Sequence, residues 1–78
     1  MKVSVHAAQR FLERVMQKST YSNKDIGFTM RFLEKSLQDI VPTSYAKRFV
    51  IPGFENYRAI YRENTVITII QKGENYAH

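Results

Sequence analysis

The sequence predicts an α+β fold in which two N-terminal helices pack on a three-stranded, mainly antiparallel β-sheet. Its 78 residues suffice for one small domain, residues 1–78, with a single core. Apolar residues recur at helical spacing before Pro42. After Pro42 the chain is rich in β-branched and aromatic residues, which are typical of strands.

The first predicted helix spans residues 4–18, with Ser4 as its N-cap. Its apolar residues follow the spacing of an amphipathic helix: Val5, Ala8, Leu12, Val15 and Met16. The STYSN segment at residues 19–23 favours a turn, because its side chains compete with helical hydrogen bonds. The helix is therefore expected to end there.

The second predicted helix spans residues 23–41. Ser22 and Asp25 have the spacing of a capping box at its start. Apolar residues then recur at steps of four and three: Ile26, Met30, Leu33, Leu37 and Ile40. Pro42 ends the helix, because proline lacks a backbone donor and disfavours helical geometry in the residue before it.

Three strands are predicted at residues 46–51, 56–62 and 65–72. Pro52 and Gly53 predict a turn between the first two strands, and Glu63 and Asn64 predict a two-residue hairpin loop between the last two.

This loop predicts the register of the hairpin, with Arg62 opposite Thr65 and Tyr61 opposite Val66. Further along, it places Ile60 opposite Ile67, Arg58 opposite Ile69, Ala59 opposite Thr68 and Tyr57 opposite Ile70. Both faces are partly apolar, so the pattern leaves open which face the helices cover.

Four phenylalanines are predicted to complete the core: Phe28, Phe32, Phe49 and Phe54. Phe28 and Phe32 lie off the main apolar stripe of their helix. The alternative is that these two rings belong to a hydrophobic groove that receives a partner protein.

Composition and charge exclude several classes of protein. The chain has no cysteine, so it forms neither disulfides nor a thiolate zinc site, and a reducing compartment, the cytoplasm, is expected. It has no apolar run long enough to cross a membrane, and no phosphate loop or metal-ligand motif. No metal or cofactor is expected. A net charge of +5 favours association with a polyanion such as nucleic acid.

A row of basic side chains is predicted on the first helix, where His6, Arg10 and Arg14 recur every four residues. His6 is the one internal side chain whose ordinary pKa lies near neutrality, which suits proton transfer to or from a phosphate ester. The alternative is a solvated helix face whose arginines are partly neutralised by Glu13.

A second group of candidate residues lies in the sheet. Arg58 and Arg62 share one face of a strand, and Tyr57 and Tyr61 share the other. Arg48 adds a further guanidinium group from the neighbouring strand, and Lys72 an ammonium group at the end of the last strand. Arginine matches phosphate oxygens and tyrosine stacks on unpaired bases. The alternative is that the tyrosines only pack and the arginines only protect the sheet edge.

Two segments together resemble the RelE/ParE superfamily of small toxin ribonucleases and gyrase poisons. YRAIYRENTVITIIQKG at residues 57–73 is similar to the superfamily's Tyr-Arg-apolar-apolar-Tyr strand, short turn, β-branched strand and glycine. SVHAAQRFLER at residues 4–14 resembles a group of small prokaryotic and phage proteins of the same fold, in which a His and following arginines mark the first helix.

This resemblance implies that Arg58 holds the scissile phosphate and that His6 transfers protons. The chain departs from the superfamily after Gly73, because Glu74 and Asn75 replace the usual basic residues. The usual C-terminal catalytic tyrosine matches only Tyr76, and only loosely.

The predicted function is a RelE-like toxin that cleaves single-stranded or messenger RNA without a metal. A 2′-hydroxyl attacks the adjacent phosphate with His6 as general base or acid, while Arg10, Arg58 and Arg62 stabilise the developing charge. The predicted substrate-binding residues are Arg10, Arg14, Arg48, Tyr57, Tyr61, Arg62 and Lys72. A separately encoded acidic antitoxin is the expected partner, and the oligomeric state stays open. The alternative is a non-catalytic basic protein that binds RNA or inhibits a host protein such as gyrase.

Overall fold

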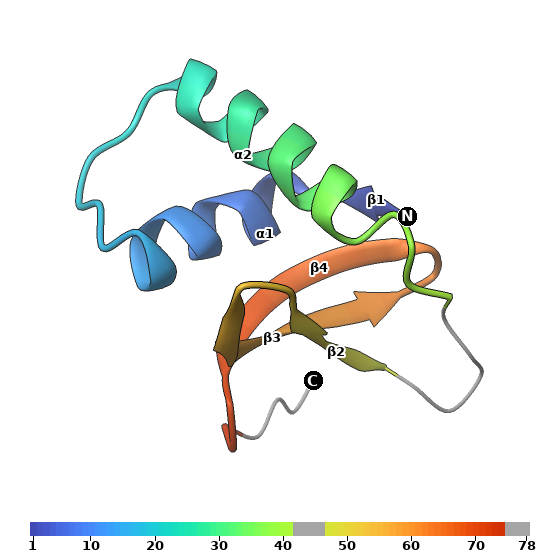
Figure 1. Cartoon of the computed structure of the whole chain (residues 1–78). Helices are drawn as coiled ribbons and strands as arrows, with labels where there is room; N and C mark the ends of the chain where they lie inside the picture. The colour runs from blue at the N-terminus through green and yellow to red at the C-terminus, as the bar shows by residue number, and fades with distance from the viewer. Residues whose placement is uncertain (42–46, 75–78) are drawn as a thin grey trace.

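The helices lie on one face of a curled, four-stranded sheet (Figure 1). The computed structural model describes residues 1–41 and 47–74. Its elements are β1 (Lys2–Val3), α1 (Val5–Arg10), the π-helix η1 (Phe11–Val15), α2 (Asn23–Ser36), β2 (Arg48–Ile51), β3 (Phe54–Arg62) and β4 (Thr65–Gln71). This confirms the α+β class. The role of Pro42, the strand start at residue 46, and the predictions for Asn75 and Tyr76 lie outside the described residues.

The sheet has the order β1-β4-β3-β2, so the prediction of three strands is wrong by one strand. β1 is parallel to β4, which makes the sheet mixed. The Lys2 amide donates to the Asn64 carbonyl at 3.1 Å, and the Ser4 amide to the Val66 carbonyl at 2.9 Å. Because β1 has only two residues and its partner lies at the far end of the chain, no local pattern reveals it.

The first helix begins as predicted but widens into a π-helix halfway along. The Ser4 hydroxyl accepts a hydrogen bond from the Ala7 amide at 3.0 Å, which confirms the N-cap. Further on, the Met16 amide donates to the Phe11 carbonyl five residues back, at 3.1 Å. The helical part ends at Val15 rather than at residue 18. π-Helical turns are rare, and many of them occur at functional sites.

The buried side of this helix differs from the predicted stripe. Ala8 and Leu12 are buried as predicted, but Val5 is 51% exposed and Met16 is 50% exposed. Phe11, which lies outside the predicted stripe, is part of the core. Met16 follows the π-helical turn, which changes the angle between successive side chains, so a fixed period of 3.6 residues misplaces it.

α2 begins at the predicted capping box. The Asp25 amide donates to the Ser22 hydroxyl at 3.2 Å, and the Ser22 amide donates to the Asp25 carboxylate at 3.0 Å. The helix ends at Ser36, five residues earlier than predicted. Leu33 and Leu37 are fully buried, which confirms the central part of the predicted stripe.

The predicted turn between β3 and β4 is confirmed. Glu63 and Asn64 both have positive φ, 50° and 61°, as a two-residue type I′ turn requires. The first pairs of the hairpin, Arg62 with Thr65 and Tyr61 with Val66, also agree with the predicted register.

The register prediction is wrong beyond these two pairs, because β4 contains a bulge. Ile60 pairs with Thr68 rather than with Ile67, and Arg58 pairs with Ile70 rather than with Ile69. Ile67 has no partner on β3 and is the extra residue. A bulge of one residue moves every later β4 side chain to the other face relative to β3.

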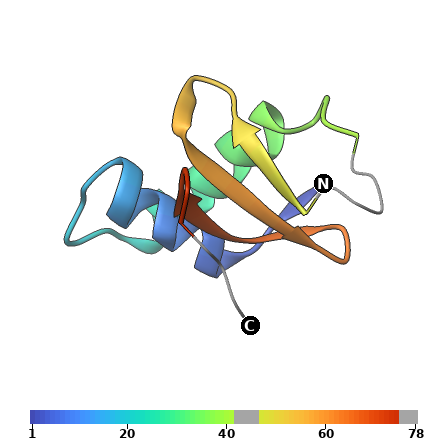
Figure 2. The same ribbon diagram turned by 90° about the horizontal axis from the view of Figure 1, so that it is seen from below.

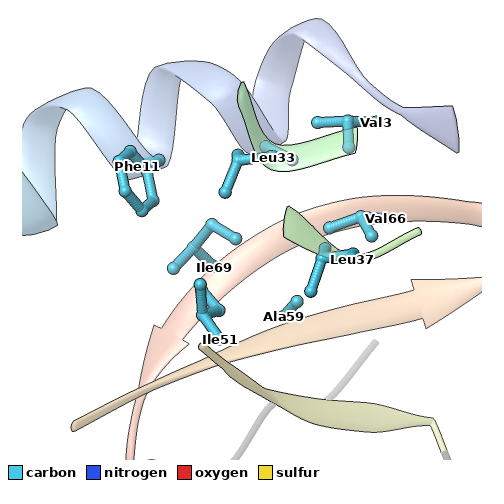
Figure 3. Close-up of a cluster of buried hydrophobic side chains, with 9 residues drawn as sticks. Val3, Phe11, Leu33, Leu37, Ile51, Ala59, Val66 and Ile69 are labelled. Carbon is cyan, nitrogen blue, oxygen red and sulfur yellow. The ribbon is translucent and has the colours of Figure 1, made fainter. Parts of the chain in front are cut away.

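Nine buried apolar residues from both layers form the core (Figure 3). They are Val3, Ala7, Phe11, Leu33, Leu37, Ile51, Ala59, Val66 and Ile69. Because Ala59 and Ile69 point toward the helices, strand alternation directs Arg58 and Ile70 to the opposite face. That face of the sheet is turned toward the viewer in Figure 2. The structure thus decides which face the helices cover.

Candidate functional site

Three of the predicted site residues, the catalytic candidate Arg58 and the binding candidates Arg48 and Arg62, lie together on the sheet face turned away from the helices. Arg58 and Arg62 flank Ile60 on β3, and Arg48 lies directly opposite Ile60 on β2. Side chains in such positions are neighbours on one face of a sheet. Arg48, Arg58 and Arg62 are called the arginine face below.

Arg58 is held in place by backbone carbonyls. Its Nη1 atom donates to the Glu55 carbonyl at 2.6 Å and to the Tyr57 carbonyl at 3.0 Å. A guanidinium group has five N–H donors, so these contacts orient the group and leave other donors for a ligand. Carbonyl acceptors carry no net charge, so these two contacts do not pair Arg58 with an anion.

Carboxylates do not neutralise the arginine face within residues 1–41 and 47–74. The ion pairs in that part of the chain join Arg10 to Glu13 and Arg14 to Glu74. Arg48 does reach Glu74, but it donates to the backbone carbonyl, at 3.3 Å.

The two tyrosines of β3 lie on the helix side of the sheet. The Tyr57 hydroxyl donates to the Arg14 carbonyl at 3.2 Å. The Tyr61 ring packs against Phe49, with ring centroids 5.7 Å apart. The predicted division of arginines and tyrosines between two faces is confirmed, so these rings do not stand beside the arginine face as partners for bases.

The two arginines of the basic row on α1 and η1 make internal contacts. Arg10 pairs with Glu13 at 2.6 Å, and the Tyr21 hydroxyl donates to the same carboxylate at 2.6 Å. The hydrogen bond from Tyr21, followed by that from Arg10, holds the pKa of Glu13 below its ordinary value. The bond to Glu13 raises the pKa of Tyr21. Both shifts favour the hydrogen-bonded pair of ionised carboxylate and neutral phenol.

Arg14 covers the edge of β4, beyond the short stretch that pairs with β1. Its Nη1 atom donates to the Ile69 carbonyl at 3.1 Å and lies 3.4 Å from the Glu74 carboxylate. That carboxylate also accepts from the Gln71 amide at 3.1 Å. Glu74 therefore binds Arg14, one of the residues predicted to bind phosphate.

The two predicted catalytic residues are not brought together. His6 is exposed on α1, which packs against α2 and β4. Arg58 lies on β3 and faces away from the helices. No hydrogen bond or ion pair among the described residues joins them. Lys72 is exposed in the turn after β4, where its backbone amide donates to the Asn56 carbonyl at 2.8 Å.

An apolar groove lies between the helices, next to the loop that connects them. It has a volume of about 360 Å³. Its lining residues come from η1 and the following loop, from α2 and from the start of β3: Phe11, Leu12, Met16, Lys18, Asp25, Phe28, Thr29, Phe32 and Phe54. Phe11, Phe32 and Phe54 contact one another, with ring centroids between 5.3 and 6.3 Å apart.

The prediction that four phenylalanines complete the core is wrong for the two that line this groove from α2. Phe28 is 68% exposed and Phe32 is 39% exposed, whereas Phe54 packs against the core. Phe49 is half-buried beside Tyr61. In the sequence, Phe28 and Phe32 lie off the apolar stripe of α2. This position is compatible with a place in the core and with a place in a groove.

Comparison of the chain with protein-family models, curated proteins and solved structures found no match. The resemblance to the RelE/ParE superfamily therefore stays a prediction. Over the described ranges, no helix has the length and apolar character needed to cross a bilayer. The same residues contain no group of three or more side chains suited to hold a metal ion.

Proposed function

We propose that the protein binds single-stranded RNA through the arginine face. The observation that carries this proposal is the gathering of Arg48, Arg58 and Arg62 on one sheet face, without a carboxylate partner among the described residues. Guanidinium groups match phosphate oxygens in shape and charge. The net charge of +5 adds long-range attraction to any polyanion.

The geometry favours contacts to phosphates over contacts to bases. Tyr57 and Tyr61 lie on the other face of β3, so the described part of the arginine face has no ring on which a base can stack. Phosphate contacts carry little sequence information. Binding is therefore expected to depend steeply on salt and weakly on RNA sequence.

The test is fluorescence anisotropy with a labelled single-stranded RNA at several salt concentrations. Replacing Arg62 by Gln should weaken binding and lower the slope of log K against log salt by about 0.7, the value for one lost contact to a single strand. Lys47→Gln is the matched control, because Lys47 is an exposed cation that precedes β2 and is not part of the arginine face. Equal effects of the two substitutions would contradict the proposal.

RNA cleavage is the second candidate function. It is favoured by His6, which is exposed and makes no hydrogen bond to the described residues, one helical turn before Arg10. As general base, His6 would take the proton of the attacking 2′-hydroxyl. In this role it would act without Arg58, which lies elsewhere, and Arg10 would have to leave its ion pair with Glu13 to contact the phosphate.

Incubation of single-stranded RNA with the purified protein in EDTA tests cleavage separately from binding. RNA cleavage by the wild type and no cleavage by His6→Ala would support this second function. If both proteins leave the RNA intact while binding persists, the toxin-ribonuclease interpretation fails and RNA binding stands.

The resemblance adds two further proposals. A ribonuclease toxin would have a separately encoded acidic antitoxin, which a short reading frame overlapping the gene would support. A gyrase inhibitor would cause DNA damage rather than RNA loss when it is expressed.

A further inference from the structure

The apolar groove lies on the helix side of the molecule, whereas the arginine face lies across the sheet from it. Phe28 and Met16 leave much of their apolar surface in water, at 68% and 50% exposed. Neighbouring apolar side chains that stay exposed around a cavity mark an interaction site more often than isolated ones do. The π-helix η1 supplies Phe11 and Leu12 to the same groove.

The outer side of α2 beside the groove is cationic. Lys24, Arg31 and Lys35 are exposed on the same side of the helix as Phe28 and Phe32, opposite the buried side of α2. Within the described part of the chain, no carboxylate forms an ion pair with any of the three cations.

The acidic residue in the groove lining is already engaged in a hydrogen bond. Asp25 lines the groove, but its carboxylate accepts the Ser22 amide in the capping box. That hydrogen bond is the main cause that lowers the pKa of Asp25. The groove therefore offers an apolar floor, and the adjoining helix face offers positive charge.

We propose that this groove is the docking site for an amphipathic α-helix of a partner protein. The apolar side chains of that helix would fill the groove against Phe28 and Phe32, and its acidic side chains would face Lys24, Arg31 and Lys35. A groove between two helices suits an apolar helix ridge. The cations select an acidic helix over a basic one and accelerate its association. This inference does not rest on RNA binding.

The test uses a designed amphipathic peptide of about 18 residues, long enough to form a helix, with leucines along one side and glutamates beside them. A matched peptide carries lysines in place of the glutamates. Each is labelled with a fluorophore and titrated with the full chain. The acidic peptide should bind at least about tenfold more tightly than the basic one, and added salt should narrow the difference.

Substitutions then locate the site. Phe28→Ala should weaken binding of the acidic peptide about tenfold, because a ring that becomes buried on binding is lost. Val5→Ala is the control, since Val5 is similarly exposed on α1 but lies outside the groove. Arg31→Glu should weaken binding, and Lys47→Glu should not. Because Phe28 and Arg31 are exposed, both variants should fold, which circular dichroism checks.

Three outcomes would overturn the proposal. One is equal affinity for the acidic and basic peptides. Another is unchanged peptide binding in Phe28→Ala. The third is a dimer that Phe28→Ala disperses, without peptide binding, because it would show that a second copy of the chain covers the groove. RNA binding of the same variants is measured by fluorescence anisotropy. This measurement shows whether a substitution affects the groove alone or also the arginine face.

Discussion

Glu13 joins the first helix to the loop that follows it. Its carboxylate accepts short hydrogen bonds from Arg10 and from Tyr21, eight residues further along the chain. The lowered pKa of Glu13 means that these bonds contribute stability above the ordinary pKa of a glutamate. This contribution is lost as the pH falls through the lowered pKa. The raised pKa of Tyr21 adds stability that is lost as the pH rises through it.

Replacing Tyr21 by Phe should raise the pKa of Glu13 toward its ordinary value, because the largest cause of its shift is removed. A titration of the side-chain carboxyl followed by NMR measures this pKa. Tyr61→Phe is the matched control, because Tyr61 packs against Phe49 and not against Glu13. If the two variants give the same pKa for Glu13, the hydrogen bond does not determine it.

Arg14 shows how a residue predicted from spacing acquires another role in the fold. Its place in the basic row of the first helix predicts that Arg14 binds phosphate. In the structure its guanidinium group satisfies the Ile69 carbonyl at the edge of β4 and binds Glu74. Unpaired edge groups are a liability for a sheet, and a side chain that bonds to them stabilises it. Spacing along one helix could not show this contact, since it crosses 55 residues of sequence.

Local chemistry explains the start of α2 and the turn between β3 and β4. The capping box and the type I′ turn each depend on residues that are neighbours in the sequence, and the sequence predicts both. The sequence patterns predict neither the π-helix η1 nor the bulge in β4.

Replacing Ser22 by Ala should lower the free energy of unfolding by about 1 kcal/mol, because the Asp25 amide loses its capping acceptor. Urea denaturation followed by circular dichroism measures this change. Ser19→Ala in the preceding loop is the control, and it should change the free energy by less than about 0.5 kcal/mol. An equal loss in both variants would argue against the cap.

Replacing Glu63 by Asn should stabilise the protein by about 0.5 kcal/mol, because asparagine tolerates a left-handed backbone better than glutamate. Glu63→Gln is the control, since it removes the same charge without the same backbone preference. The melting temperature of each variant measures the effect. A gain in Glu63→Gln as large as that in Glu63→Asn would assign it to charge instead.

At the scale of the whole molecule, the core lies between the helix layer and one face of the sheet, and the positive charge lies on both sides of the fold. Leu33 and Leu37 of the α2 stretch meet Ala59, Val66 and Ile69 of the sheet in this core. The arginine face lies on the far side of the sheet, and Lys24, Arg31 and Lys35 lie on the outside of α2. The basic residues of the arginine face and those on the outside of α2 therefore form two separate surfaces.

Replacing Leu37 by Ala should lower the free energy of unfolding by about 3 kcal/mol, because it leaves a cavity where the side chain is fully buried. Val41→Ala is the contrasting variant, because Val41 is 82% exposed, and it should change the free energy by less than about 0.5 kcal/mol. Thermal or urea unfolding measures both changes. Comparable losses would mean that the core is not centred on the helix-sheet interface.

The sequence by itself determined the α+β class, both helix caps, the hairpin turn and the basic character of the chain. These features depend on composition or on residues within a few positions of one another. The tertiary structure alone decided that β1 joins the sheet, that Arg48, Arg58 and Arg62 face away from the helices, and that Arg14 covers the β4 edge. It also decided that Phe28 lies in an open groove. Each of these depends on contacts between distant segments, which a local period or spacing does not encode.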